Sequence, residues 1–158
     1  MKISNLLSAD RILLDIEAHK PEGVIEALVN LLAEVNAIED PDTVLKLVID
    51  RELEVGTGIG YGVAIPHTEP GPFPEPLLAF GRTVNGINFH SPDGSKARLI
   101  FLLLTPDKTP ALHVRLLARI CRLMKCRDLR EKLLEVRNSV AAARLISEIE
   151  ADYPELNP

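Results

Sequence analysis

Six consecutive apolar residues, Leu99 to Leu104, sharply limit the folds open to this chain. Side chains of a β-strand point alternately to the two faces of a sheet, so this run would present apolar groups on both faces. Such a strand is stable where both faces are covered, as in the centre of a sheet with helices above and below. The run therefore predicts a central strand in a layered domain.

Apolar residues at helical spacing, with proline or a capping residue at the start, predict five helices. We expect them over 21–36, from Asp40-Pro41 to Arg51, from Thr109-Pro110 to Met124, from Asp128 to Leu134 and from Ser139 to Ile149. Further strands are expected over 63–65, 77–84 and 87–89. The four prolines of segment 69–76 predict an irregular surface loop, and the tail after Tyr153 is expected to be loosely held.

The length of 158 residues suits one domain that buries roughly 70% of the surface of its unfolded chain. We predict a single domain over residues 1–158, of class α/β (α+β in some schemes). Its three layers, α/β/α, would enclose a central mixed β-sheet, because the central strand needs a helix layer on each face. The order of the strands does not follow from the pattern.

Charge and hydropathy narrow the possible partners. The net charge of −5 disfavours nucleic-acid binding, but residues 111–137 hold eight Lys or Arg against three Asp or Glu, which would suit an acidic protein partner. The stripe of Arg115, Arg119 and Arg122 is interpreted as a solvated helix face, with nucleic acid as the alternative.

No signal peptide or membrane-spanning run is visible, so a cytoplasmic location is expected. Cys121 and Cys126 match neither a redox nor a zinc motif and are expected to be ordinary packing residues or free thiols.

His67 is the sharpest candidate for chemistry, because it stands directly after Pro66 at the end of a short predicted strand. A neutral imidazole nitrogen is a competent nucleophile that can accept and return a phosphoryl group. The preceding segment 55–62 has glycine at every second position, yet it matches neither a P-loop nor Gly-x-Gly-x-x-Gly. Its glycines could expose N–H groups to an anion, allow another backbone to approach closely, or form an ordinary loop.

Read together, these features resemble a known phosphorylation-site signature. Arg51-Glu52 followed by Gly56-Thr57-Gly58-Ile59-Gly60-Tyr61-Gly62-Val63-Ala64-Ile65-Pro66-His67 is similar to the signature of type 2 enzyme IIA (EIIA) domains of the bacterial phosphotransferase system (PTS), the fructose, mannitol and nitrogen-regulatory class. Phe89, Asp93-Gly94, the Leu99 to Leu104 run, Pro106 and Leu112-His113 follow in the order of that family. The resemblance covers a core of about residues 6–149.

The resemblance implies a phosphotransferase component that takes a phosphoryl group onto His67 from phosphorylated HPr or its nitrogen-system counterpart. It would pass the group to an enzyme IIB in sugar transport, or regulate a transporter or kinase. His113 and Arg51 match the supporting histidine and arginine of the family. The chemistry agrees, since phosphoryl transfer depends on positioning and charge stabilisation. No cofactor, metal, nucleic acid or membrane insertion is implied.

Three other interpretations remain at this stage. The chain could be a non-catalytic EIIA-like binding module that controls a partner through protein contacts. His67 and His113 could belong to a metal hydrolase site, which lacks a convincing third ligand. Without the resemblance, His113 would be read as a core-edge histidine and Arg51 as a helix-end residue. Thr68-Glu69, where glycine often follows the family's histidine, and Tyr61, acidic in some members, leave the partner and the sugar open.

Overall fold

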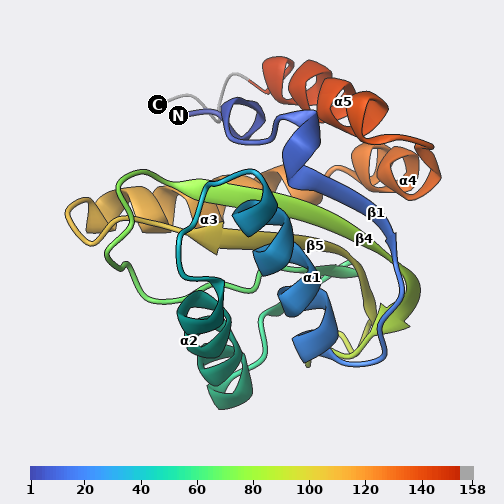
Figure 1. The fold of residues 1–158 in the computed structure, drawn as a ribbon. Coiled ribbons are helices and arrows are strands. Elements are labelled where there is room, and N and C mark those ends of the chain that lie inside the picture. Colours follow the sequence, from blue (N-terminus) through green and yellow to red (C-terminus); the bar gives the residue numbers. More distant parts are fainter. Residues whose placement is uncertain (154–158) are drawn as a thin grey trace.

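The computed structural model describes residues 1–153, and Figure 1 shows their fold, a sheet with helices on both faces. Within these residues the sheet has five strands in the order β1-β4-β5-β3-β2. The strands are β1 (Ile12–Ile16), β2 (Gly58–Gly60), β3 (Val63–Ala64), β4 (Leu77–Ile87) and β5 (Ala97–Leu104). Since β5 is antiparallel to β4 and parallel to β3, the sheet is mixed, as predicted.

Helices cover both faces of this sheet. They are α1 (Pro21–Glu34), α2 (Pro41–Glu54), α3 (Pro110–Met124), α4 (Arg127–Glu135) and α5 (Ser139–Ala151), with short 3-10 turns η1 (Ile3–Asn5) and η2 (Ala9–Arg11). In Figure 1, α1 and α2 lie in front of the sheet and α3 lies behind it. The three-layer α/β architecture inferred from the sequence is confirmed.

The central strand divides the core in two, as its sequence predicts. Leu99, Phe101 and Leu103 pack into a cluster with apolar residues of α3, α4 and α5. The alternating residues Ile100, Leu102 and Leu104 pack into a second cluster with α1 and α2. Each face of β5 is therefore sealed by a separate helix layer. Cys121 and Cys126 are free thiols packed at the edge of the first cluster, as expected.

A side-chain cap is present at the starts of α2 and α5, and two of the expected caps are corrected. The Asp40 carboxylate accepts a hydrogen bond from Thr43 N at the start of α2. Asp128 was expected to cap the fourth helix, but it lies inside the first turn of α4, where a negative charge favours the helix dipole. The cap of α5 is Asn138 instead of Ser139, because the Asn138 side chain accepts from Ala141 N.

The strands differ from the sequence pattern in three places. β1, at the edge of the sheet, was not predicted, and β2 lies inside the glycine-rich segment that had been expected to be irregular. The strand expected over 77–84 continues to Ile87 as β4, whose pairing with β5 shifts register between Arg82 and Ile87. A bulge of this kind preserves a strand while interrupting its alternation. Of the second strand expected over 87–89, only Ile87 belongs to β4. The expected loose tail lies outside the described residues.

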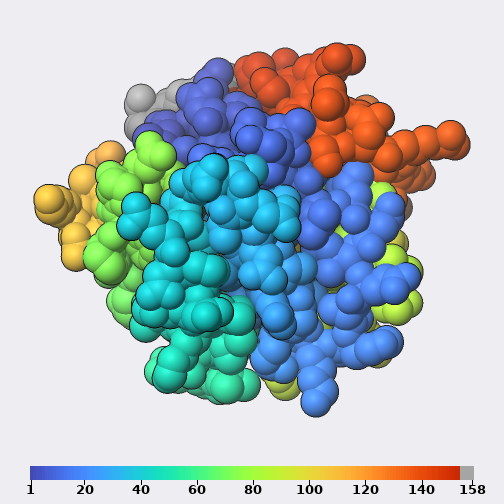
Figure 2. Space-filling view, in the orientation of Figure 1, coloured from blue at the N-terminus to red at the C-terminus, as the bar shows by residue number. Residues whose placement is uncertain are grey.

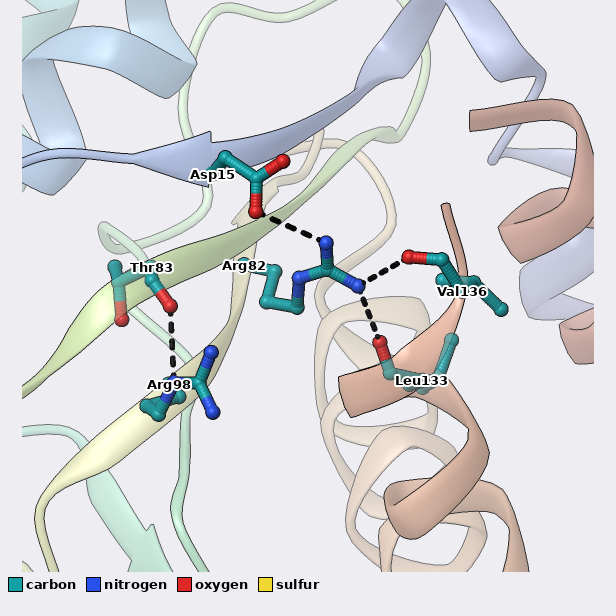
Figure 3. Close-up of polar contacts among 6 residues, drawn as sticks. All are labelled: Asp15, Arg82, Thr83, Arg98, Leu133 and Val136. Carbon is teal, nitrogen blue, oxygen red and sulfur yellow. Dashed lines mark hydrogen bonds and ion pairs between the residues drawn. The ribbon is translucent and has the colours of Figure 1, made fainter. Parts of the chain in front are cut away.

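Arg82 joins three elements at a buried position, as Figure 3 shows. Its Nη1 donates to the carbonyl oxygens of Leu133 (3.1 Å) and Val136 (2.6 Å) at the end of α4, and its Nη2 donates to Asp15 Oδ1 of β1 at 3.0 Å. Carbonyls at a helix C-terminus lack intrahelical partners, so a guanidinium there satisfies them. Arg98 Nε donates to the Thr83 carbonyl at 3.0 Å and ties β5 to β4 nearby.

A buried carboxylate fixes the N-terminus against the last helix. Glu150 of α5 is fully buried and accepts hydrogen bonds from Ile3 N and Ser4 N at 2.8 and 2.9 Å. The N-terminal segment lies against α5 in the space-filling view of Figure 2. Arg119 Nη1 lies 3.6 Å from the same carboxylate, so Arg119 faces the interior. The arginine stripe expected on α3 is thus reduced to Arg115 and Arg122, which are exposed.

Candidate functional site

His67 is held against the sheet by the residues around it. Pro66 precedes it, and the Pro66 carbonyl accepts a hydrogen bond from Leu103 N of β5 at 3.0 Å. His67 itself forms an isolated parallel bridge with Leu103. The N–H of Ile65 donates to the Thr57 carbonyl at 3.1 Å. The backbone of His67 is therefore fixed on both sides, while its side chain remains partly exposed.

One ring nitrogen of His67 is committed to the backbone. Its Nδ1 lies 2.7 Å from the carbonyl oxygen of Ile65. A carbonyl can only accept, so Nδ1 carries the proton of the neutral ring and Nε2 keeps its lone pair. The geometry thus leaves Nε2 as the nucleophilic atom.

His113 lies beside His67, although the two are far apart in the sequence. It sits in the first turn of α3, is 9% exposed, and its ring centroid lies 5.4 Å from that of His67 with the planes tilted by 59°. Its Nδ1 lies 2.6 Å from Thr105 Oγ1, just past the end of β5. The two histidines singled out in the sequence therefore form one cluster, with the His113 ring fixed by its own partner.

Arg51, the third predicted site residue, lies on α2. It lies in the last turn of that helix, and its Nη1 donates to the Val55 carbonyl at 2.8 Å. Its positive charge is one of the causes that lower the pKa of His67. Arg51 thus acts on His67 through its charge, and the Arg51 side chain donates its hydrogen bond to the end of its own helix.

Burial lowers the pKa of both imidazoles. Desolvation is the main cause that lowers the pKa of His67, and Arg51 adds to it, against the Ile65 hydrogen bond and the charge of Glu69. The pKa of His113 is also lowered, chiefly by burial and then by His67, with Glu69 acting in the opposite direction. Since a protonated ring has no lone pair, the lowered pKa leaves His67 ready to act as a nucleophile near neutrality.

This pKa direction gives a pH prediction. We expect the protonation midpoints of the His67 and His113 rings to lie below pH 6.5, the ordinary pKa of histidine, because burial disfavours the charged form. Titration of the ring signals by NMR measures both midpoints, with free histidine in the same buffers as the control. A midpoint at or above 6.5 for His67 would contradict the prediction.

Glu52 supports the site by fixing the segment before His67, a role that the sequence did not reveal. This buried carboxylate at the end of α2 accepts from Thr57 N at 3.0 Å and from Thr57 Oγ1 at 2.6 Å. Burial raises its pKa, and the two bonds from Thr57 oppose that rise. Because the Thr57 carbonyl in turn binds Ile65 N, Glu52 fixes the segment that orients His67. Glu52 belongs to the motif quoted above, but the motif does not show its contact.

Gly56 and Gly58 of the glycine-rich segment allow another part of the same chain to approach closely. A Cβ on Gly56 would lie 2.3 Å from the Phe89 carbonyl oxygen, and one on Gly58 would lie 2.1 Å from Ser91 Oγ. The N–H of Gly58 donates to that same Phe89 carbonyl at 3.0 Å. Of the options open from the sequence, the close approach at these two glycines is therefore to a neighbouring segment of the same chain.

Residues 1–153 contain no group of three or more His, Cys, Asp or Glu side chains placed to hold a metal ion. None of their helices has both the length and the apolar character needed to cross a membrane.

Comparison with known proteins gives consistent results. Residues 5–149 match the family model described as phosphoenolpyruvate-dependent sugar phosphotransferase system, EIIA 2. The chain is 32% identical over 147 residues to a PTS fructose-specific EIIA component of Haloferax volcanii, covering 93% of this chain and 96% of that protein. It is also 32% identical to a PTS fructose-specific EIIABC component of Bacillus subtilis, over 94% of this chain but only 23% of that protein.

A solved structure is also similar to this chain. The nitrogen regulatory protein IIA-Ntr of Neisseria meningitidis superimposes with a TM-score of 0.83 at 29% identity, covering 91% of this chain and 98% of that one. The resemblance inferred from the motif is confirmed by these matches. The chain therefore belongs to the EIIA type 2 family of the phosphoenolpyruvate-dependent sugar phosphotransferase system.

Proposed function

We propose that the chain is a cytoplasmic phosphocarrier, a phosphotransferase component that accepts a phosphoryl group on Nε2 of His67 from a phosphorylated HPr-type protein. The observation that carries this proposal is the hydrogen bond between His67 Nδ1 and the Ile65 carbonyl, which leaves Nε2 unprotonated beside the buried imidazole of His113. Family membership supports the same role. The receiver is an enzyme IIB, or else the phosphorylation state regulates a transporter or kinase.

The transfer step uses groups already in place. The lone pair of His67 Nε2 attacks the phosphorus of the donor phosphohistidine, the phosphorus–nitrogen bond to the donor breaks, and its electron pair returns to the donor ring. The phosphorylated ring of His67 keeps the proton on Nδ1 and gains positive character, which the Ile65 carbonyl stabilises by accepting that N–H. His113 and Arg51 act on the phosphoryl oxygens as hydrogen-bond donor and positive charge.

Incubation with phosphoenolpyruvate, enzyme I and a panel of HPr-type proteins tests the proposal by intact mass. We expect a gain of one phosphoryl group, acid-labile and base-stable, that depends on enzyme I and on one class of donor. Removal of divalent metal from this chain should leave the transfer rate from the isolated phosphorylated donor unchanged. Absence of labelling with every donor, or a rate on this chain that only added zinc or magnesium restores, would refute the proposed mechanism.

The same labelled protein identifies the receiver. Phosphorylated chain, separated from the donor, is mixed with candidate enzyme IIB proteins, and loss of its phosphoryl mass is followed over time. Transfer to an enzyme IIB assigns the chain to sugar uptake, whereas a stable label together with phosphorylation-dependent binding of a transporter or kinase assigns it to regulation.

A further inference from the structure

Thr105 is a buried polar residue that contacts both His113 and the loop after His67. It directly follows β5, has no exposed surface, and its Oγ1 lies 2.6 Å from His113 Nδ1. Its carbonyl oxygen accepts from Gly71 N at 2.9 Å, in the loop that follows His67. One residue therefore contacts the supporting imidazole through its side chain and the loop after the nucleophile through its backbone.

The direction of the side-chain bond follows from the need to pair buried polar groups. Within residues 1–153, Thr105 Oγ1 has no hydrogen-bond partner other than His113 Nδ1. If Nδ1–H donated to the hydroxyl oxygen, the hydroxyl proton would be buried without an acceptor, which is destabilising. If the hydroxyl donates to Nδ1, both groups are satisfied. The hydroxyl is therefore the donor.

This direction decides which nitrogen of His113 can donate. A neutral imidazole has one N–H, so a ring that accepts at Nδ1 must carry its proton on Nε2. His113 also lies in the first turn of α3, where the helix dipole favours negative charge and disfavours a second ring proton. The ring then presents a neutral N–H donor next to His67.

We propose that Thr105 is a positioning residue for phosphoryl transfer: its hydroxyl holds His113 in the tautomer with the proton on Nε2, so that His113 can donate to the phosphoryl oxygens at His67. This inference rests on the proposed function for its effect on rate, and on the structure alone for the tautomer. The opposite tautomer would present a lone pair, which repels phosphoryl oxygens.

Two substitutions separate the hydroxyl from the shape of the residue. Thr105→Val keeps the branched side chain and the backbone carbonyl that binds Gly71, but has no hydroxyl. Thr105→Ser keeps the hydroxyl and is the matched control. ¹⁵N NMR of the histidine rings reports the tautomer of His113, and single-turnover labelling by an HPr-type donor reports the rate.

We expect the wild type and Thr105→Ser to show the proton of His113 on Nε2, and Thr105→Val to lose this preference. Thr105→Val should slow labelling about tenfold or more, because a misplaced imidazole proton is costly, and Thr105→Ser should restore most of the rate. In a His113→Ala background the same valine substitution should have no further effect, since the two residues act as one unit.

Three results would overturn the inference. They are a wild-type spectrum with the His113 proton on Nδ1, a Thr105→Val protein that keeps both tautomer and rate, and an equal loss of rate with and without His113. The wild-type spectrum decides the tautomer even where Thr105→Val does not fold. If the wild type is never labelled, the proposed function fails, while the spectrum still tests the tautomer.

Discussion

The His67→Ala protein should accept no phosphoryl group from any HPr-type donor. Its remaining histidines include His113, but this residue is only 9% exposed and its Nδ1 is occupied by Thr105, so it cannot meet a donor protein as His67 does. Nucleophilic transfer is lost altogether when the attacking atom is removed, whereas the loss of a supporting group only slows it. Intact mass after incubation with phosphoenolpyruvate, enzyme I and the donor measures the result.

A matched control is available on the surface. His19 is exposed and follows β1 in the turn that leads to α1, so His19→Ala should be labelled like the wild type. Thermal melts of both variants check that each is folded. Full labelling of the His67→Ala protein would move the acceptor elsewhere and remove the basis of the proposed mechanism.

Replacing His113 with alanine should slow labelling about 100-fold or more without abolishing it. In the proposed mechanism the Nε2–H of His113, whose ring lies 5.4 Å from that of His67, donates to charge that develops on the phosphoryl oxygens. Loss of one such donor commonly costs this much in rate. His113→Gln separates donation from titration, because the amide donates but does not titrate. Retained transfer with a flatter pH profile in that variant would indicate a positioning role.

The same rate measurement tests Arg51. Arg51→Ala should also slow labelling, because its positive charge acts on His67 and would offset the negative charge of the incoming group. Lys46, an exposed lysine paired with Asp50 on the same helix, provides the control: Lys46→Ala should leave the rate unchanged. Wild-type rates in both His113→Ala and Arg51→Ala would restrict the site to His67.

The layered fold could be predicted because burial leaves a direct mark on the sequence. The six apolar residues of β5 require cover on both faces, and the structure divides them between two helix layers. The helices followed from periodicity and from caps such as Asp40. β1 was missed because an edge strand has pairing on one side only, which places weaker demands on its residues.

The site was partly visible in the sequence. Pro66 and the short strand before it are sequence neighbours of His67, so the sequence alone could indicate that His67 is held in a fixed position. The pairing of His67 with His113 came only through the family resemblance, because contact between distant residues leaves no trace in periodicity or composition. The structure brings the two rings to 5.4 Å, which agrees with that expectation.

By itself, the sequence determined the central strand, the helix layers and the family, and it singled out His67 as the candidate acceptor. These properties depend on neighbours in the chain and on which side chains must leave water. Only the tertiary structure decided which nitrogen of His67 is free, that Glu52 fixes Thr57, and that Thr105 meets His113. The two residues of each hydrogen bond lie only two to eight positions apart, but the side-chain conformation that forms the bond depends on how the surrounding elements pack. Buried polar groups must be paired where the fold places them.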